Sequence, residues 1–151
     1  MKKIILLAIA LLPLLSCNQE EAKASLKIPA RPAAAQGALV VVGTLQALPV
    51  PFPANDLYQY AYVMKYSVDS VVEGKLEGRE ILVAHFDPRT PRAKISDDRK
   101  STVGGALESF QPGDRHYLVL RPLDSAWTGA IEDNYPQDKS PRWWASWVDR
   151  I

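Results

Sequence analysis

The longest run of alternating apolar and polar side chains lies in residues 57–74, LYQYAYVMKYSVDSVVEG. Successive side chains of a strand point to opposite faces, so this pattern predicts a strand with one core face and one wetter face. At about 3.3 Å per residue it would approach about 50 Å, so we expect it to bend or bulge, as strands of small barrels do. One parity supplies the predicted core face (Tyr58, Tyr60, Tyr62, Met64, Tyr66, Val68, Val72), and the other is mostly polar (Gln59, Lys65, Ser67, Asp69).

Three further segments also have the pattern of strands. Residues 38–48, ALVVVGTLQAL, are β-branched and continuous enough to form a buried strand. Residues 79–86 follow a glycine-containing turn and predict the hairpin partner of the long strand, and residues 111–123 combine a Pro-Gly turn with a fourth strand. We therefore expect a mainly β fold: a single small five-stranded OB-like barrel over residues 37–151, with one short helical turn at 104–110.

The C-terminal segment KSPRWWASWVDRI, residues 139–151, allows two interpretations. Ser140 and Pro141 suit the cap and first position of a helix, which favours a C-terminal helix with Trp143 and Trp147 one turn apart. The alternative, a strand, also leaves these two side chains on one face. In either case the tryptophans would plug an open end of the barrel, or form a platform that stacks on a sugar or anchors a partner (Trp143, Trp144, Trp147).

The N-terminus resembles the signal peptide of bacterial lipoprotein precursors. A basic start is followed by an apolar run over residues 4–15, shorter than the roughly 20 residues that a membrane-spanning helix needs. The run ends in LLSC, which is similar to a lipobox. The resemblance implies a signal peptide over residues 1–16, cleavage before Cys17, and acylation of that cysteine as a membrane anchor. The alternative is an ordinary signal peptide in which Cys17 falls at this place by accident.

Residues following the cysteine extend this interpretation. Asn18 resembles the sorting signal of lipoproteins that reside in the outer membrane and face the periplasm. Residues 18–36 are rich in alanine, proline and charge, a composition that predicts a flexible tether, so 17–36 is expected to be the lipidated cysteine and its linker. The alternative is that part of this stretch packs on the domain as a first strand.

Cysteine content and charge exclude several classes of function. Cys17 is the only cysteine, so a lipidated chain has no thiol left for a disulfide, a zinc site or a nucleophile. Of the 18 lysines and arginines, two lie in the signal peptide, which leaves 16 against 17 acidic residues. This near-neutral balance, with no basic stripe, argues against a nucleic-acid partner.

A long polar segment separates the third and fourth predicted strands. Residues 87–110 contain two prolines and several basic side chains, among them Arg89, Arg92 and Lys94, beside aspartates. A loop of this length inside a small domain is usually functional or disordered. A solvated mixed-charge loop is one interpretation, and a loop that binds an anion or a partner is the other.

The two histidines are the remaining candidates for chemistry. His85 precedes Asp87 by two residues on one predicted strand, and His116 lies on the next, so the three could form a metal site if the strands were neighbours. The spacing matches no metal motif, and histidines at a sheet surface are the simpler interpretation. No G-x-S-x-G nucleophile motif is present. We therefore expect no catalysis and no cofactor, with the metal site as the alternative.

Residues 38–123 also resemble netrin-type OB barrels, the fold shared with tissue inhibitors of metalloproteinases. The resemblance rests on the strand end VVEGKLEG, the strand EILVAHF and the motif F-x-P-G-D-R-x-Y-L-V-L. It implies the barrel but not the inhibition, because those inhibitors use a free N-terminal cysteine and several disulfides. The overall expectation is a lipid-anchored, non-enzymatic module that binds or supports another envelope protein or a polysaccharide.

Overall fold

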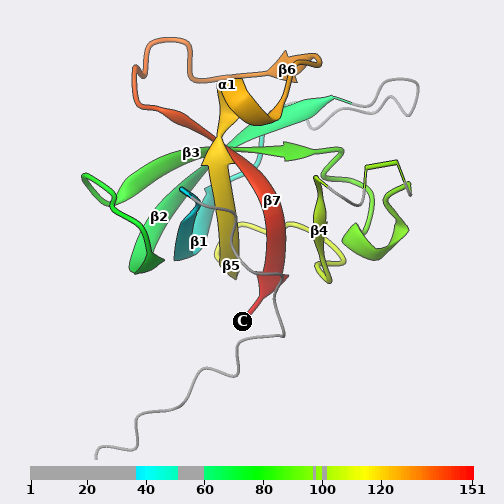
Figure 1. Cartoon of the computed structure of the whole chain (residues 1–151), viewed down its shortest axis with the longest axis horizontal. Helices are drawn as coiled ribbons and strands as arrows, with labels where there is room; N and C mark the ends of the chain where they lie inside the picture. The colour runs from blue at the N-terminus through cyan, green and yellow to red at the C-terminus, as the bar shows by residue number, and fades with distance from the viewer. Residues whose placement is uncertain (1–36, 51–59, 97, 100–101) are drawn as a thin grey trace, which may run out of the picture.

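The computed structural model of the 151-residue chain describes residues 37–50, 60–96, 98–99 and 102–151 (Figure 1). Strands account for most of the regular structure, and the two helical segments are single turns. The elements in chain order are β1 Leu39–Ala47, β2 Ala61–Glu73, β3 Glu80–Phe86, the 3-10 turn η1 Arg92–Lys94, β4 Gly104–Gly105, β5 Arg115–Pro122, α1 Leu123–Ala126, β6 Ile131–Glu132 and β7 Arg142–Arg150.

Five of the strands close into a barrel. β1 pairs antiparallel with both β2 and β5, β2 pairs with β3, and β7 lies between β5 and β3, which completes the circle β1-β5-β7-β3-β2. β7 runs antiparallel to β5 and parallel to β3. The short strands β4 and β6 are additions to the barrel that pair with β7 and β2, respectively. The expectation of a mainly β, five-stranded OB-like barrel is confirmed.

The first two barrel strands bend where their pairing is irregular. The β1–β2 register shifts three times, between Val40 and Val41, between Val42 and Gly43, and between Leu45 and Ala47. Such irregularities increase the local twist, which lets a long strand wrap around a small barrel instead of running straight. At Gly43 the strands approach closely, because a Cβ there would lie 3.1 Å from the carbonyl oxygen of Ser67.

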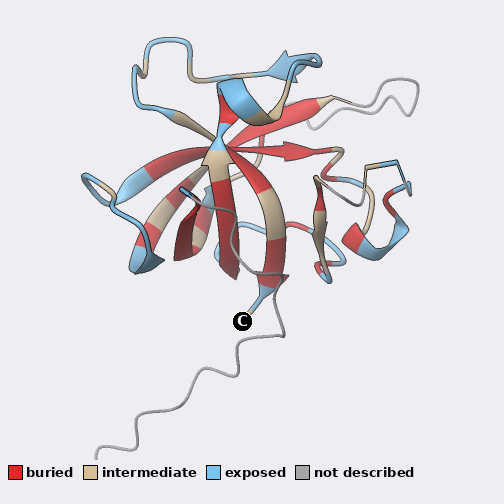
Figure 2. Ribbon diagram, in the orientation of Figure 1, coloured by how far each residue is buried: buried red, intermediate tan, exposed pale blue. Residues whose placement is uncertain are grey.

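Buried residues run along all five barrel strands (Figure 2). Their side chains form a core inside the barrel and two more clusters on its outer surface. Met64, Tyr66 and Val68 point into the barrel, as the alternation in β2 predicted. The opposite parity is also buried at the start of β2, because residues before and after β5 cover it. This outer cluster consists of Ala61, Val63, Leu82, Ala84, Phe86, Ile95, Val103, Leu123 and Trp144.

The far end of β2 differs from its expected pattern. Val72, predicted to belong to the core face, is 43% exposed, and so is Val71. The physical reason is that β2 pairs with β3 only as far as Ser67, where it meets Glu80. Beyond that point β2 has β1 on one side only, and the strand projects past the barrel core.

The helical segments do not lie where the sequence predicted them. Residues 142–150 form strand β7 and not a C-terminal helix, because this segment supplies the backbone partner that both β5 and β3 need to close the barrel. The short helical turn expected at 104–110 is also wrong: Gly104–Gly105 is strand β4, and the helical turns are η1 and α1. Hydrogen bonds between distant segments override the local preferences here.

The signal peptide, Cys17 and the tether lie outside the described residues. Among the residues that the structure does describe, no helix is long and apolar enough to cross a bilayer.

Candidate functional site

His85 on β3 and His116 on β5 meet inside the barrel. The hydroxyl of Tyr66 on β2 joins them, 3.1 Å from Nε2 of His85 and 3.0 Å from Nδ1 of His116. The Phe110 ring lies against both imidazoles, with ring centroids 4.6 Å and 5.6 Å apart. All three polar side chains have no exposed surface. Sequence reasoning placed Tyr66 in the core but missed that it links the two histidines.

Burial keeps this cluster neutral. Desolvation lowers the pKa of His85 well below its usual value, with help from the nearby charge of Arg92, and lowers the pKa of His116 to about 4. Desolvation also raises the pKa of Tyr66 well above 10. The phenol has one proton, so it donates to one imidazole and accepts from the other. The remaining ring nitrogens, Nδ1 of His85 and Nε2 of His116, have no hydrogen-bond partner.

The metal-ligand set proposed from the sequence is not assembled. Asp87 lies at the start of a tight turn with φ of +33°, and its carboxylate accepts a 2.7 Å hydrogen bond from the Thr90 hydroxyl. Within the described part of the chain, no three histidine, cysteine, aspartate or glutamate side chains are close enough to hold one ion. The structure therefore brings His85 and His116 together without Asp87.

The basic residues of the loop after β3 separate into two kinds. Arg92 is 3% exposed, and its guanidinium donates to the backbone carbonyls of Asp87 and Thr90 at 2.6 Å and 3.0 Å. Desolvation lowers the pKa of Arg92 to about 10. Arg89 and Lys94 are exposed. Arg92 therefore fastens the turn from beneath, while the other two side chains lie on its surface.

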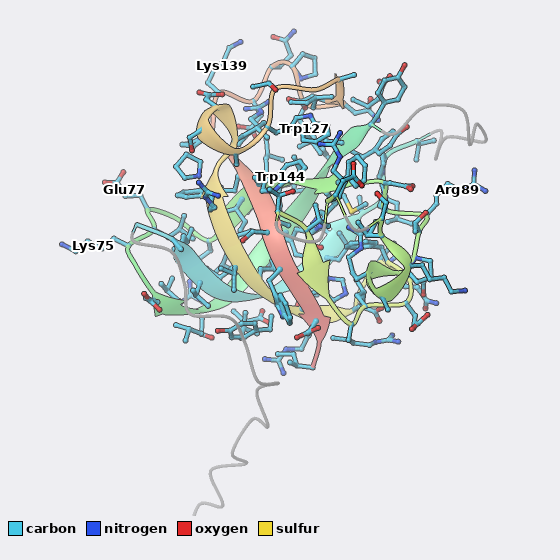
Figure 3. The ribbon with its side chains drawn as sticks, turned by 45° about the vertical axis from the view of Figure 1, so that its right-hand side comes forward. Lys75, Glu77, Arg89, Trp127, Lys139 and Trp144 are labelled. Carbon is cyan, nitrogen blue, oxygen red and sulfur yellow. The ribbon has the colours of Figure 1, made fainter. Side chains whose placement is uncertain are left out.

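Trp144 lies in the outer cluster and has little surface left for a ligand. It is 1% exposed, stacks on Trp127 with centroids 4.8 Å apart, and donates its indole N–H to the carbonyl of Thr102 at 3.0 Å. Arg99 in turn places its guanidinium over the Trp127 ring at 5.2 Å. Trp127 and Trp144 are labelled in Figure 3.

Trp147 packs on a different outer surface. Ser146 is an extra residue in β7, opposite the step from Val119 to Leu120, and this bulge moves Trp147 to the face opposite Ala145. The indole N–H of Trp147 donates to the buried carboxylate of Asp149 at 2.7 Å, and its ring covers Gly104 of β4. Neither Trp144 nor Trp147 points into the barrel, so the expected plug is not formed by them.

Trp143 is the remaining tryptophan of β7 and differs from Trp144 and Trp147. It is half-buried, packs against the barrel core, and lines an open pocket of about 320 Å³. The β2–β3 turn forms one wall of this pocket, and the residues just before β7 form the other. Its lining combines apolar side chains (Leu76, Ile81, Pro141, Trp143) with polar ones (Lys75, Glu77, Glu80, Ser140).

Arg142 fixes the wall that precedes β7. Its side chain donates to the carboxylate of Asp133 at 2.9 Å and to three backbone carbonyls, those of Tyr135, Asp138 and Ser140. The residue is adjacent to Trp143 in the chain and pairs with β3 in the barrel. One side chain thus ties together the 133–140 segment, whose last residue, Ser140, lines the pocket.

No known protein family, curated protein or solved structure matches this chain.

Proposed function

We propose that this protein is a non-enzymatic module of the cell envelope, anchored through lipid on Cys17 to the outer membrane and facing the periplasm. There it binds or supports another envelope component, protein or polysaccharide. The observation that carries the proposal is the pocket beside Trp143, where a half-buried aromatic ring lies among exposed polar side chains. Aromatic side chains in open hollows with a few polar neighbours are typical of binding sites.

The polar residues of the barrel interior support a binding role over catalysis. His85 and His116 have no exposed surface, and they are bonded to Tyr66 and not to a solvent-facing group. A general acid or base has to reach the substrate within hydrogen-bond distance. These imidazoles instead pack as part of the core.

The anchor is tested by replacing Cys17. The Cys17→Ser protein should incorporate no labelled fatty acid, whereas Ser16→Ala, which keeps the thiol and a small neighbour, should still be acylated. Incorporation of the label into Cys17→Ser would contradict the anchor. The binding role is tested with the same unlipidated protein, which should sediment saturably with isolated envelopes.

A further inference from the structure

We propose that the pocket beside Trp143 is a saccharide subsite that holds one ring of a neutral polysaccharide. This inference rests on the proposed binding function and names its ligand class. The pocket lies between the β2–β3 turn, which carries the labelled Lys75 and Glu77 in Figure 3, and the segment around Ser140 and Pro141.

The floor of the pocket is suited to the apolar face of a sugar. A pyranose ring presents C–H groups on its face and hydroxyl groups around its edge. Trp143 packs against the barrel core on its buried side and lines the pocket on the other, with Leu76 and Ile81 nearby. A large indole held in this way supplies apolar contact area with little entropy to lose on binding.

The rim supplies hydrogen-bonding groups of both kinds. Glu77 and Glu80 offer carboxylate acceptors, Lys75 offers an ammonium donor, and the Ser140 hydroxyl, which donates to Asp138, can still accept. All four residues are exposed, so they can reach a bound ligand. Hydroxyl groups of a sugar both donate and accept, and hydrogen bonds to charged partners are stronger than those between neutral groups.

The charge balance favours a neutral ligand. A cation entering the pocket would meet Lys75, and an anion would meet Glu77 and Glu80, so neither sign is consistently attracted. Glu80 is already paired with Lys65 across β2 and β3, 2.9 Å apart, which weakens its pull on a free cation. A polyhydroxyl chain avoids these conflicts.

The geometry also favours a chain over a single sugar. A second hollow, of about 560 Å³, also borders the β2–β3 turn and shares Lys75, Leu76 and Glu77 with the first. Its lining includes Val71, which is 43% exposed. A polysaccharide can cross the turn and occupy both hollows, whereas a monosaccharide uses only one.

The pocket wall is held in place before any ligand arrives. The four polar groups that Arg142 engages, described above, fix the backbone from Asp133 to Ser140. Arg142 is therefore a positioning residue for the pocket. Preorganisation of this kind improves affinity because less ordering is needed on binding.

The test compares isolated envelopes treated in two ways, using the Cys17→Ser full-length protein. Periodate oxidation cleaves vicinal diols of sugars, and protease digestion removes exposed protein. We expect periodate to abolish sedimentation with envelopes and protease digestion to leave it intact. The reverse result, binding lost with protease and retained after periodate, would identify a protein partner and overturn the saccharide inference while leaving the proposed binding function in place.

The site is tested with two substitutions of Trp143 and one control substitution. Trp143→Ala should weaken envelope binding at least tenfold, and Trp143→Phe, which keeps an aromatic face, should weaken it less. Trp147→Phe, on the other side of β7, is the matched control and should bind as the unsubstituted protein does. Circular dichroism confirms that each variant is folded. Equal binding by folded Trp143→Ala and Trp147→Phe would overturn the assignment of this pocket.

Soluble probes separate failure of the inference from failure of the proposed function. Cellotriose and maltotriose, which are neutral and carry vicinal diols, are titrated into the protein, and tryptophan fluorescence is followed with and without 0.5 M NaCl. At least one should produce a saturable, salt-insensitive change that Trp143→Ala abolishes. No change with either of them at about 10 mM would overturn the saccharide inference. Absence of binding to untreated envelopes would instead contradict the proposed function.

Discussion

Acidification should destabilise the folded protein through the cluster of Tyr66, His85 and His116, because both imidazoles are buried. In the unfolded chain each imidazole has a pKa near its usual value of 6.5. In the folded protein desolvation lowers the pKa of His116 to about 4 and that of His85 well below 6.5. Between about pH 6.5 and 4 the unfolded chain therefore binds more protons, and the free energy of unfolding falls as the pH falls.

The loss of folding free energy grows with the number of pH units below 6.5. Each unit below 6.5 costs about 1.4 kcal/mol per histidine for as long as the folded form stays neutral. At pH 4.5 the loss is about 2–3 kcal/mol for His116, and His85, whose pKa burial also lowers, adds a loss of the same sign. Domains of this size are stabilised by about 5–15 kcal/mol in total, so the expected loss is a large part of the free energy of unfolding. Nearby charges, Arg92 for His85 and Asp114 and Arg150 for His116, modify the pKa values less than burial does.

Urea unfolding, followed by circular dichroism at pH 7.5, 6.0, 5.0 and 4.5, measures this loss. The matched control is the double variant His85→Gln and His116→Asn, whose amides stand near Nε2 and Nδ1 and can still bond Tyr66 without titrating. We expect the stability of the unsubstituted protein to fall steeply below pH 6.5 and that of the variant to fall much less. Equal slopes in a folded variant and the unsubstituted protein would refute the reasoning.

Four substitutions test other contacts, each by urea unfolding. Tyr66→Phe removes the hydroxyl that two imidazoles share, and leaving both ring nitrogens unpaired should cost about 2–5 kcal/mol. Trp144→Ala should cost about 3–5 kcal/mol, and Trp147→Ala should cost less because Trp147 is only half-buried. Asp149→Asn weakens bonds from the Ala106 amide and the Trp147 indole, which should cost about 1–3 kcal/mol and speed hydrogen exchange at Ala106.

Much of the fold could be predicted because strand patterning is local. The alternation through Met64, Tyr66 and Val68 identified the interior face of β2, and the β-branched run at 39–47 identified β1. The expected bending of the long strand is realised as shifts in the β1–β2 register. Each of these features depends on side chains within a few residues of one another, which a pattern can report.

The C-terminal segment shows where local reasoning failed. Ser140 and Pro141 resemble a helix start, but no helix follows, because β7 gains two backbone partners by pairing with β5 and β3. In addition, the bulge at Ser146 reverses the alternation, so Trp143 and Trp147 do not share a face as a regular strand would require. A bulge depends on the partner strand, which the segment itself does not specify.

The candidate site also combines features that the sequence identified with features that only the tertiary structure decided. The sequence alone identified Trp143 as a candidate for binding and the histidines as candidates for chemistry, because these residue types are uncommon and carry distinctive side chains. Barrel closure decided how accessible each of them is. It sealed His85 and His116 around Tyr66, whereas Trp143 was left half-buried beside a turn some 65 residues earlier in the chain. The physical reason is that burial, and with it pKa and access to a ligand, depends on which distant strands become neighbours, and only tertiary pairing sets that.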